Sequence, residues 1–263
     1  MIKLEKINMI FGEGTPNRNH VLKDLDLKVS RGDFITIIGS NGAGKSTLFN
    51  VISGNLKPSG GKVTIQNQDV TGHPEYRRAR YIGRIFQDPL LGTAGKMSIV
   101  DNMMVAGYKG FKGLKISLTK AKRHYFREQL RSLDMDLEHR LDDNVALLSG
   151  GQRQALTLLM MALSKPELVL LDEHTAALDP RNAAQVMDLT TRFITEYGFT
   201  VMMITHNMQQ AIAYGNRLLM MDEGKIIIDI RGKEKEALTV DSLVKRFHDI
   251  RKKDFTTDEA LLT

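Results

Sequence analysis

The sequence contains no cysteine. A disulfide framework, a thiolate metal site and a cysteine nucleophile are therefore excluded, and a reducing compartment such as the cytosol is expected. Long apolar runs are also missing: Leu158–Leu163 and Leu168–Leu171 fall far short of the roughly 20 apolar residues that a membrane span needs. The first residues form no basic leader followed by an apolar segment, so we expect neither a membrane-spanning helix nor a secretory signal.

Size and composition are those of an ordinary globular protein. The 263 residues allow one large domain, or one core with an inserted subdomain. Hydrophobic residues make up 42% and charged residues 26% of the chain, and there are no low-complexity tracts or internal repeats. This composition argues against a disordered, fibrous or propeller protein.

The excess of positive charge is concentrated in one segment. Lysine and arginine outnumber aspartate and glutamate by 37 to 31, which gives a net charge of +6. Between Lys109 and Arg131 there are eight basic residues and one acidic residue, Glu128, so the remainder is about neutral. Such a segment is typical of a solvated helix face or of contact with anionic headgroups, and nucleic-acid binding is the weaker alternative. We expect no nucleic-acid partner.

Two kinds of strand pattern occur in the chain. Apolar and polar residues alternate in Ile2–Asn8 and Leu25–Val29, which predicts two half-buried strands at an antiparallel edge. Nearly unbroken apolar runs are typical of parallel strands covered on both faces. These runs are Phe34–Ile38, Leu168–Leu171, Val201–Ile204 and Leu218–Met221.

Helix signals separate the covered strands. Asp179 as N-cap, Pro180 in the first turn and Gly198 at the end predict one crossover helix, and a second is expected over Asn207–Tyr214, ending at Gly215. By contrast, Met97–Leu148 lacks a strand-like run and repeats apolar residues at helical spacing. The residues that carry this spacing are Leu118, Tyr125, Leu130 and Leu133. We interpret this part as an inserted helical subdomain.

A phosphate-binding loop lies between the strand that ends at Ile38 and a helix predicted over Gly44–Ser53. Residues 39–46 match the pattern G-x-x-x-x-G-K-[ST] in the strand–loop–helix context that the pattern requires. Backbone N–H groups of such a loop point at phosphate oxygens, Lys45 reaches the β and γ phosphates, and Ser46 ligates Mg²⁺. The residues predicted to bind the nucleotide here are Gly39, Ser40, Asn41, Gly42, Ala43, Gly44, Lys45, Ser46 and Thr47.

Two carboxylates follow the buried run Leu168–Leu171. Asp172 and Glu173 would lie at the carboxyl edge of the sheet, where open α/β sheets bind ligands. We predict that Asp172 ligates the Mg²⁺ that Ser46 also holds, and that Glu173 activates the attacking water. Read in isolation, the pair could equally be solvated acids at a strand end.

The predicted fold is α/β: a P-loop NTPase core, with a mostly parallel sheet and an antiparallel β edge, carrying an inserted α-helical subdomain. The nucleotide-binding core is expected over residues 1–95 and 165–240, and the helical subdomain over 96–164. A C-terminal helix and tail are expected over 241–263.

A second anion-binding helix start is formed by Ser149, Gly150, Gly151 and Gln152, which open a helix that runs to Ser164. This motif stands between the phosphate loop and the acidic strand. In that order the motifs resemble those of the nucleotide-binding subunits of ATP-binding cassette (ABC) transporters. The resemblance covers roughly Ile2 to Phe247.

Four further residues take roles from this resemblance. Phe11 resembles the aromatic that stacks on adenine, Asp179 the acid after the acidic strand, and His206 the switch histidine. Gln87 resembles the glutamine that links the site to the helical subdomain and contacts the metal. On the residues alone, core packing for Phe11, a surface amide for Gln87 and a core histidine for His206 remain alternatives. The predicted catalytic group comprises Lys45, Gln87, Glu173 and His206, and the predicted metal ligands are Ser46, Gln87 and Asp172.

The resemblance also implies cofactors, partners and a location. ATP and Mg²⁺ would bind, and a second copy or a sister subunit would pair head to tail, so that the Ser149 region of one chain closes on ATP held by Lys45 of the other. ATP-driven closure and hydrolysis-driven opening would drive membrane permease subunits. The chain would then sit peripherally on the cytoplasmic face of the cell membrane.

An importer is favoured over an exporter, because the domain is free-standing and Asp142–Val145 lacks the Thr-Glu-Val-Gly-like segment of many exporters. Residues Asp172–Pro180 and Phe86–Leu90 resemble a bacterial subgroup that serves amino-acid or similar small-solute uptake with a solute-binding protein. A soluble assembly ATPase and an exporter subunit remain alternatives.

The sequence departs from the family pattern at one position and is distinctive in one segment. His174 stands where the family usually has proline, which puts the stiffness of the loop after Glu173 in question. The segment Gln87–Met97 is rich in glycine where the family's docking surface for the permease begins, and we expect it to select the partner.

Overall fold

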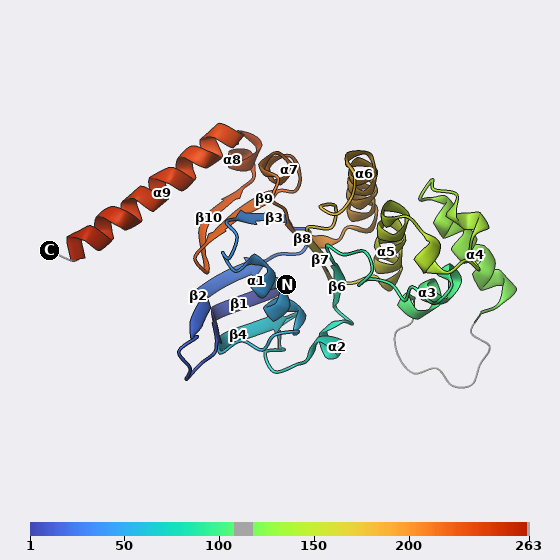
Figure 1. The fold of residues 1–263 in the computed structure, drawn as a ribbon, viewed down its shortest axis with the longest axis horizontal. Coiled ribbons are helices and arrows are strands. Elements are labelled where there is room, and N and C mark those ends of the chain that lie inside the picture. Colours follow the sequence, from blue (N-terminus) through green and yellow to red (C-terminus); the bar gives the residue numbers. More distant parts are fainter. Residues whose placement is uncertain (108–117, 262–263) are drawn as a thin grey trace. The chain divides into compact units, whose positions relative to one another are not determined.

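The structure is a computed structural model that describes the backbone of residues 1–107 and 118–261, with side chains to residue 250. The chain divides into two compact units. The first unit comprises Met1–Ile52, Leu56–Gly72 and Met202–Thr263, and the second comprises Ser53–Asn55 and His73–Val201. Figure 1 shows the elements of both.

An antiparallel sheet forms one part of the first unit. Its strand order is β2-β1-β4-β5. The strands are β1 (Ile2–Phe11), β2 (Asn19–Val29), β4 (Gly60–Ile65) and β5 (Gln68–Asp69). The predicted antiparallel edge is confirmed, but both long strands extend beyond the alternating segments. Register shifts interrupt the β1–β2 pairing between Ile7 and Met9 and between Met9 and Ile10, and such irregularities break the period of two that marks a strand in sequence.

The second sheet of this unit carries the phosphate loop. Its strands follow the order β10-β9-β3-β8. They are β3 (Phe34–Gly39), β8 (Thr200–Ile204), β9 (Arg217–Asp222) and β10 (Lys225–Arg231). β3 pairs with β9 in parallel, as predicted, whereas β10 runs antiparallel to β9. Every residue of β9 is buried, which explains its unbroken apolar run.

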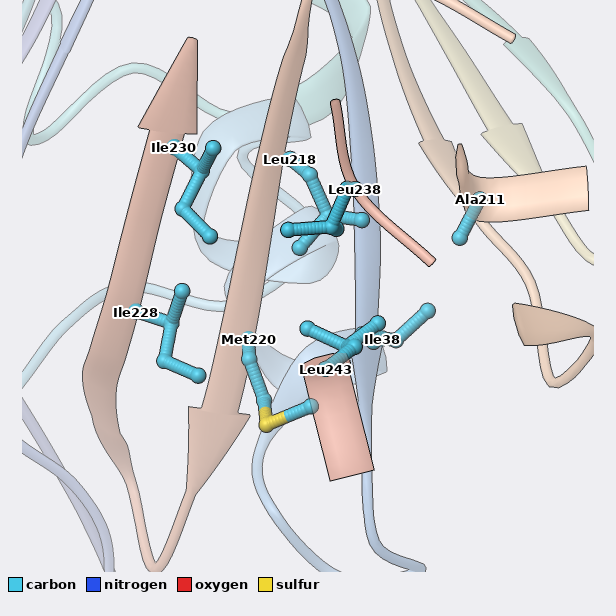
Figure 2. Packing of buried hydrophobic residues seen from close by; sticks show 8 residues of the cluster. All are labelled: Ile38, Ala211, Leu218, Met220, Ile228, Ile230, Leu238 and Leu243. Atoms are coloured by element: carbon cyan, nitrogen blue, oxygen red, sulfur yellow. The ribbon is translucent and has the colours of Figure 1, made fainter. Parts of the chain in front are cut away.

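Helices cover the β9–β10 side of this sheet. The helices of the first unit are α1 (Lys45–Ser53), α7 (Met208–Ala213), α8 (Lys233–Glu236) and α9 (Val240–Leu261). Figure 2 shows Leu243 of α9 and Ala211 of α7 gathered with strand residues in one apolar cluster. The strand and loop members are Ile38, Leu218, Met220, Ile228, Ile230 and Leu238. Phe247 and Ile250 also pack against this cluster, so Leu243, Phe247 and Ile250, at spacings of four and three residues, form the face of α9 that contacts the core.

The second unit contains two parallel strands, β6 (Ile82–Ile85) and β7 (Leu168–Asp172), paired with Ile85 opposite Leu171. Its helices are α2 (Glu75–Arg78), α3 (Ile99–Ala106), α4 (Lys120–Arg131), α5 (Gly150–Ser164) and α6 (Pro180–Tyr197), with short 3-10 turns at Leu137–His139 and Val145–Leu147. The predicted ends of α6 are confirmed: Asp179 caps its start, and Gly198 at φ 63° ends it.

The described part of 97–148 contains helices and no strand, as its apolar spacing predicted. Of the residues that carry this spacing, Leu130 and Leu133 are fully buried, whereas Tyr125 is 48% exposed beside Phe126, which is 2% exposed. Thr119 caps α4, and in the helix that follows Phe126 and Leu130 share the buried face at a spacing of four. Tyr125 lies one position away from that face.

The basic segment is only partly described. Lys109, Lys112 and Lys115 lie outside the described residues. On α4, Arg123 pairs with Asp142 and Arg131 pairs with Glu128, so part of its charge is compensated locally. Among the residues that the structure describes, no helix combines the length and the apolar character that crossing a membrane requires.

Candidate functional site

The phosphate loop has the strand–loop–helix arrangement that the sequence predicted, between β3 and α1. Gly42 and Gly44 have φ angles of 83° and 96°, which residues with a side chain rarely adopt. A Cβ on Gly44 would lie 2.9 Å from the Leu22 side chain and 3.0 Å from the Val21 carbonyl oxygen. Glycine therefore allows the loop to curl closely over β2.

The end of β9 shapes the start of the loop. A Cβ on Gly39 would lie 2.1 Å from the carbonyl oxygen of Met221. The Ser40 hydroxyl donates a hydrogen bond to Oδ1 of Asp222 at 2.9 Å, and the Gly224 N–H donates to the Ala43 carbonyl at 3.2 Å. Asp222 and Gly224 are thus supporting residues that the sequence analysis missed, since nothing in the local pattern links them to the loop.

Lys45 lies inside the curl of the loop. Its side chain is almost fully buried, and Nζ donates hydrogen bonds to the carbonyl oxygens of Gly39 at 2.8 Å and Ser40 at 2.9 Å. Asn41, Gly42 and Ser46 are exposed beside it. The Lys45 ammonium group and the N–H groups at the start of the nine-residue helix α1 are hydrogen-bond donors that suit a chain of phosphates.

His206 lies at the same edge of the sheet as the loop. β8 is the neighbour of β3, and the Thr205 N–H donates to the Ile37 carbonyl at 3.2 Å. His206 is exposed, so it is not the satisfied core histidine that the residue alone allowed. Phe11 ends β1 in the other sheet of the unit and is 38% exposed, which does not fit a core packing role.

The second unit brings together Gln87, Asp172 and Glu173. Because β6 and β7 are parallel and in register, the exposed Gln87 and the half-buried Glu173 both follow the same edge of this strand pair. Glu173 has a φ of 49°, so the chain turns sharply where the strand ends. Strained backbone of this kind is concentrated at functional sites.

Asp172 has a cationic partner that the sequence analysis missed. Nη2 of Arg84 lies 2.9 Å from Oδ2 of Asp172, and both side chains are largely buried. The guanidinium also lies 4.7 Å from the centre of the Phe86 ring. Arg84 interrupts the apolar pattern of β6, which is also why that short strand was not predicted.

His174, the residue that replaces the usual proline, is buried against α6. Its Nε2 lies 3.1 Å from the Thr190 hydroxyl, which itself donates to the Val186 carbonyl at 2.7 Å. The hydroxyl has one proton to give, so Nε2 of a neutral imidazole donates to it. Burial lowers the pKa of His174 from 6.5 to about 4, which keeps the ring uncharged near neutral pH.

The start of α5 forms the expected second helix N-terminus. The Ser149 hydroxyl accepts a hydrogen bond from the Gln152 N–H at 3.2 Å, and Oε1 of Gln152 accepts one from the Ser149 N–H at 3.2 Å. This is a capping box, which fixes the first turn. Ser149 and Gly150 are exposed, as a ligand-binding role requires, although the hydroxyl itself is engaged in the cap.

Asp179 lies near this helix start. A Cβ on Gly151 would lie 2.9 Å from the side chain of Asn182, and the Asn182 N–H donates to Asp179 at 3.2 Å. The hydrogen bonds from Asn182, first from its backbone and then from its side chain, lower the pKa of Asp179. The structure therefore gives Asp179 a helix-capping role.

The predicted magnesium ligands are chemically suitable. Ser46, Gln87 and Asp172 offer a hydroxyl, an amide and a carboxylate oxygen, and Mg²⁺ prefers a few such oxygens together with phosphates and water. Ser46 belongs to the first unit, and the other two belong to the second. Their joint role in metal binding therefore stays a prediction.

Comparisons with known proteins agree on one family. The sequence profile of the ABC transporter family matches residues 22–176. A tyrosine transport ATP-binding protein of Clostridioides difficile is 40% identical over 250 residues, which is 94% of this chain and 98% of that protein. A phosphonates import ATP-binding protein of Ruegeria is 32% identical over 237 residues, which is 87% of this chain and 88% of that protein.

A solved structure supports the same relationship. It is the dimeric, post-hydrolysis state of an ATP-binding cassette bound to ADP and Pi. Its TM-score is 0.71 at 26% sequence identity, over 88% of this chain and 98% of that one.

Proposed function

Because the chain belongs to the ABC transporter family, as an ATP-binding subunit and an ATPase, we propose that it powers solute uptake through a separate membrane permease. The observation that carries this proposal is the phosphate loop with Lys45 bonded across its curl. This loop is combined in one chain with the capped start of α5 and the acidic end of β7.

Each site residue has a chemical task in this proposal. The loop N–H groups and Lys45 bind the β and γ phosphates, and Phe11 stacks on the adenine. Ser46, Gln87 and Asp172 provide the oxygen ligands of Mg²⁺. The metal, when bound, neutralises charge that develops on the phosphates.

Hydrolysis needs a group that handles the proton of the attacking water. We assign this to Glu173, whose carboxylate follows β7 and whose backbone turns sharply away from the strand. Gln87 orients the water or the metal, and His206 contacts the γ phosphate. Asp179 caps the start of α6. We assign it to the nucleotide site because it fixes that helix start.

The start of α5 is exposed at Ser149 and Gly150, as a helix N-terminus that binds a ligand must be. We propose that Ser149–Gln152 closes on the ATP held by Lys45 of a second copy or of a sister subunit, in a head-to-tail pair. A similar cassette has been solved as a dimer with ADP and Pi, which supports this arrangement. ATP would close the pair, and hydrolysis would open it.

The proposed location is the cytoplasmic face of the cell membrane, on permease subunits. The segment Gln87–Met97 supports such docking, since Leu90 and Leu91 expose 58% and 66% of their surface. The solute is an amino acid or a similar small molecule, in line with the relative named for tyrosine transport. A solute-binding protein would deliver it from the other side.

The test is capture of the transport complex. A tagged Glu173→Gln chain is incubated with ATP and detergent-solubilised membranes of its host, and the copurifying proteins are identified. The proposal expects a polytopic permease, encoded with a solute-binding protein. Lys45→Ala serves as the matched control, which should not form the ATP-dependent complex. Capture of soluble partners alone would contradict the uptake role and leave the nucleotide chemistry untouched.

A further inference from the structure

Gln154 links the backbone beside two predicted catalytic residues. It lies on α5, two residues after Gln152, and its side chain is fully buried. Its Nε2 donates hydrogen bonds to the carbonyl oxygen of His174 at 2.7 Å and to that of Phe86 at 3.2 Å. His174 directly follows Glu173, and Phe86 directly precedes Gln87.

The orientation of this amide is determined by its neighbours. Both nearby groups are carbonyl oxygens, which only the NH₂ end of the amide can satisfy. The other end, Oε1, is buried without a hydrogen-bond partner among the described residues. Leaving a buried acceptor unpaired is unfavourable, so stability alone does not explain a glutamine here. The Gln154 amide instead holds the backbone carbonyl groups of Phe86 and His174 in place.

Those two carbonyls belong to segments that leave adjacent strands. β6 and β7 are paired up to Ile85 and Leu171, so Phe86 and His174 lie just beyond the last paired residues. The His174 ring is held separately by Thr190 of α6. The backbone after Glu173 is therefore fixed on one side by α6 and on the other by Gln154.

We infer that Gln154 is a positioning residue for ATP hydrolysis. It sets the backbone of Gln87 and Glu173 relative to each other and connects both to the helix that begins at Ser149. A movement of α5 would then shift the two residues together. This inference rests on the proposed function only in that it takes Glu173 as the residue that acts on the attacking water.

The test replaces Gln154 with methionine, which preserves the length of the side chain and removes both donors. The matched control is Thr157→Val on the same helix, because Thr157 is also buried and its hydroxyl, as far as the structure describes the chain, donates to the Arg153 carbonyl one turn back. We expect Gln154→Met to lower kcat by about 10- to 100-fold through misplacement of the reacting groups, with the KM for ATP changed by less than about threefold. The control should keep both parameters.

Hydrogen–deuterium exchange supplies a readout that does not depend on turnover. In Gln154→Met the amides of residues 86–88 and 173–176 should exchange faster than in the wild type, while those of α6 and β7 should not change. In Thr157→Val no segment near Glu173 should change. A wild-type kcat with wild-type exchange in a folded Gln154→Met chain would overturn the inference.

Gln154→Asn decides the question if the methionine variant does not fold. The asparagine amide is one methylene shorter, so it cannot hold both carbonyls at their present positions. A reduced kcat with an unchanged KM supports the inference, whereas a wild-type kcat overturns it. Failure of the proposed function gives a different result: Glu173→Gln would hydrolyse ATP normally, whatever the exchange data show for Gln154.

Discussion

Arg84 and Asp172 form an ion pair, with Nη2 of the arginine 2.9 Å from Oδ2 of the aspartate. Their side chains are only 10% and 14% exposed, so both charges are largely removed from water. The negative charge of Asp172, the proposed magnesium ligand, is thus compensated by the Arg84 guanidinium of the same unit. Removing one partner of such a pair leaves a poorly solvated charge behind.

Arg84→Met should therefore lower the free energy of unfolding by about 3 kcal/mol, because the Asp172 carboxylate loses this cation. Urea unfolding followed by circular dichroism measures the change. Arg231→Met is the control, since Arg231 pairs with Asp229 at the surface, where an ion pair contributes about 0–1 kcal/mol. An equal, small effect of both substitutions would show that the Arg84–Asp172 pair is not an important interaction.

His174 should make stability depend on pH between about 6.5 and 4. The unfolded chain binds a proton near pH 6.5, whereas burial lowers the pKa in the folded chain to about 4. The unfolded state therefore holds more protons in this window, and the free energy of unfolding falls by about 1.4 kcal/mol per pH unit as the pH drops, or about 3 kcal/mol in all.

Denaturation at pH 7 and pH 4.5 tests this dependence. His174→Asn should remove most of the slope, and His124→Asn should retain it, because His124 is exposed. The pKa values of Asp69, Asp179 and Asp229 are lowered from 3.8, so the stabilisation that these groups provide is lost only at more acidic pH. An unchanged slope in His174→Asn would contradict the assignment.

Lys45→Ala should weaken ATP binding by at least about tenfold, since a charge-assisted hydrogen bond contributes about 1.5–3 kcal/mol. The same substitution removes the two bonds that Lys45 makes to the loop carbonyls, so the loop also loses its internal brace. Equilibrium titration with a fluorescent ATP analogue measures the affinity. Lys3→Ala, at an exposed lysine of the same unit, should bind as the wild type does. Equal affinities in the two variants would exclude Lys45 from the phosphate site.

Local signals were enough to predict much of this fold. The phosphate loop could be located because glycines at fixed spacing, an apolar run before them and a lysine after them all occur within a short stretch. The ends of α6 were equally clear, because an N-cap aspartate, a proline and a terminal glycine each act on their own turn.

Features that depend on distant contacts could not be predicted in this way. Asp222 accepts a hydrogen bond from Ser40, a residue far away in the sequence. Arg84 lies next to Asp172 because β6 pairs with β7. Gln154 is the plainest case, since its spacing on α5 says nothing of the two carbonyls that it holds. Which of Tyr125 and Phe126 is buried could not be predicted for a related reason, because it depends on where α4 begins.

The central claim is that Glu173 drives ATP hydrolysis after nucleotide has bound to the Lys45 loop. It is tested most directly by measuring steady-state ATP hydrolysis and bound ATP in the purified Glu173→Gln chain beside the wild type. The account predicts an ATP affinity within about threefold of the wild type and a turnover at least about 100-fold lower, because the group that acts on the water is removed while the phosphate loop is intact. Hydrolysis by Glu173→Gln at the wild-type rate would contradict it.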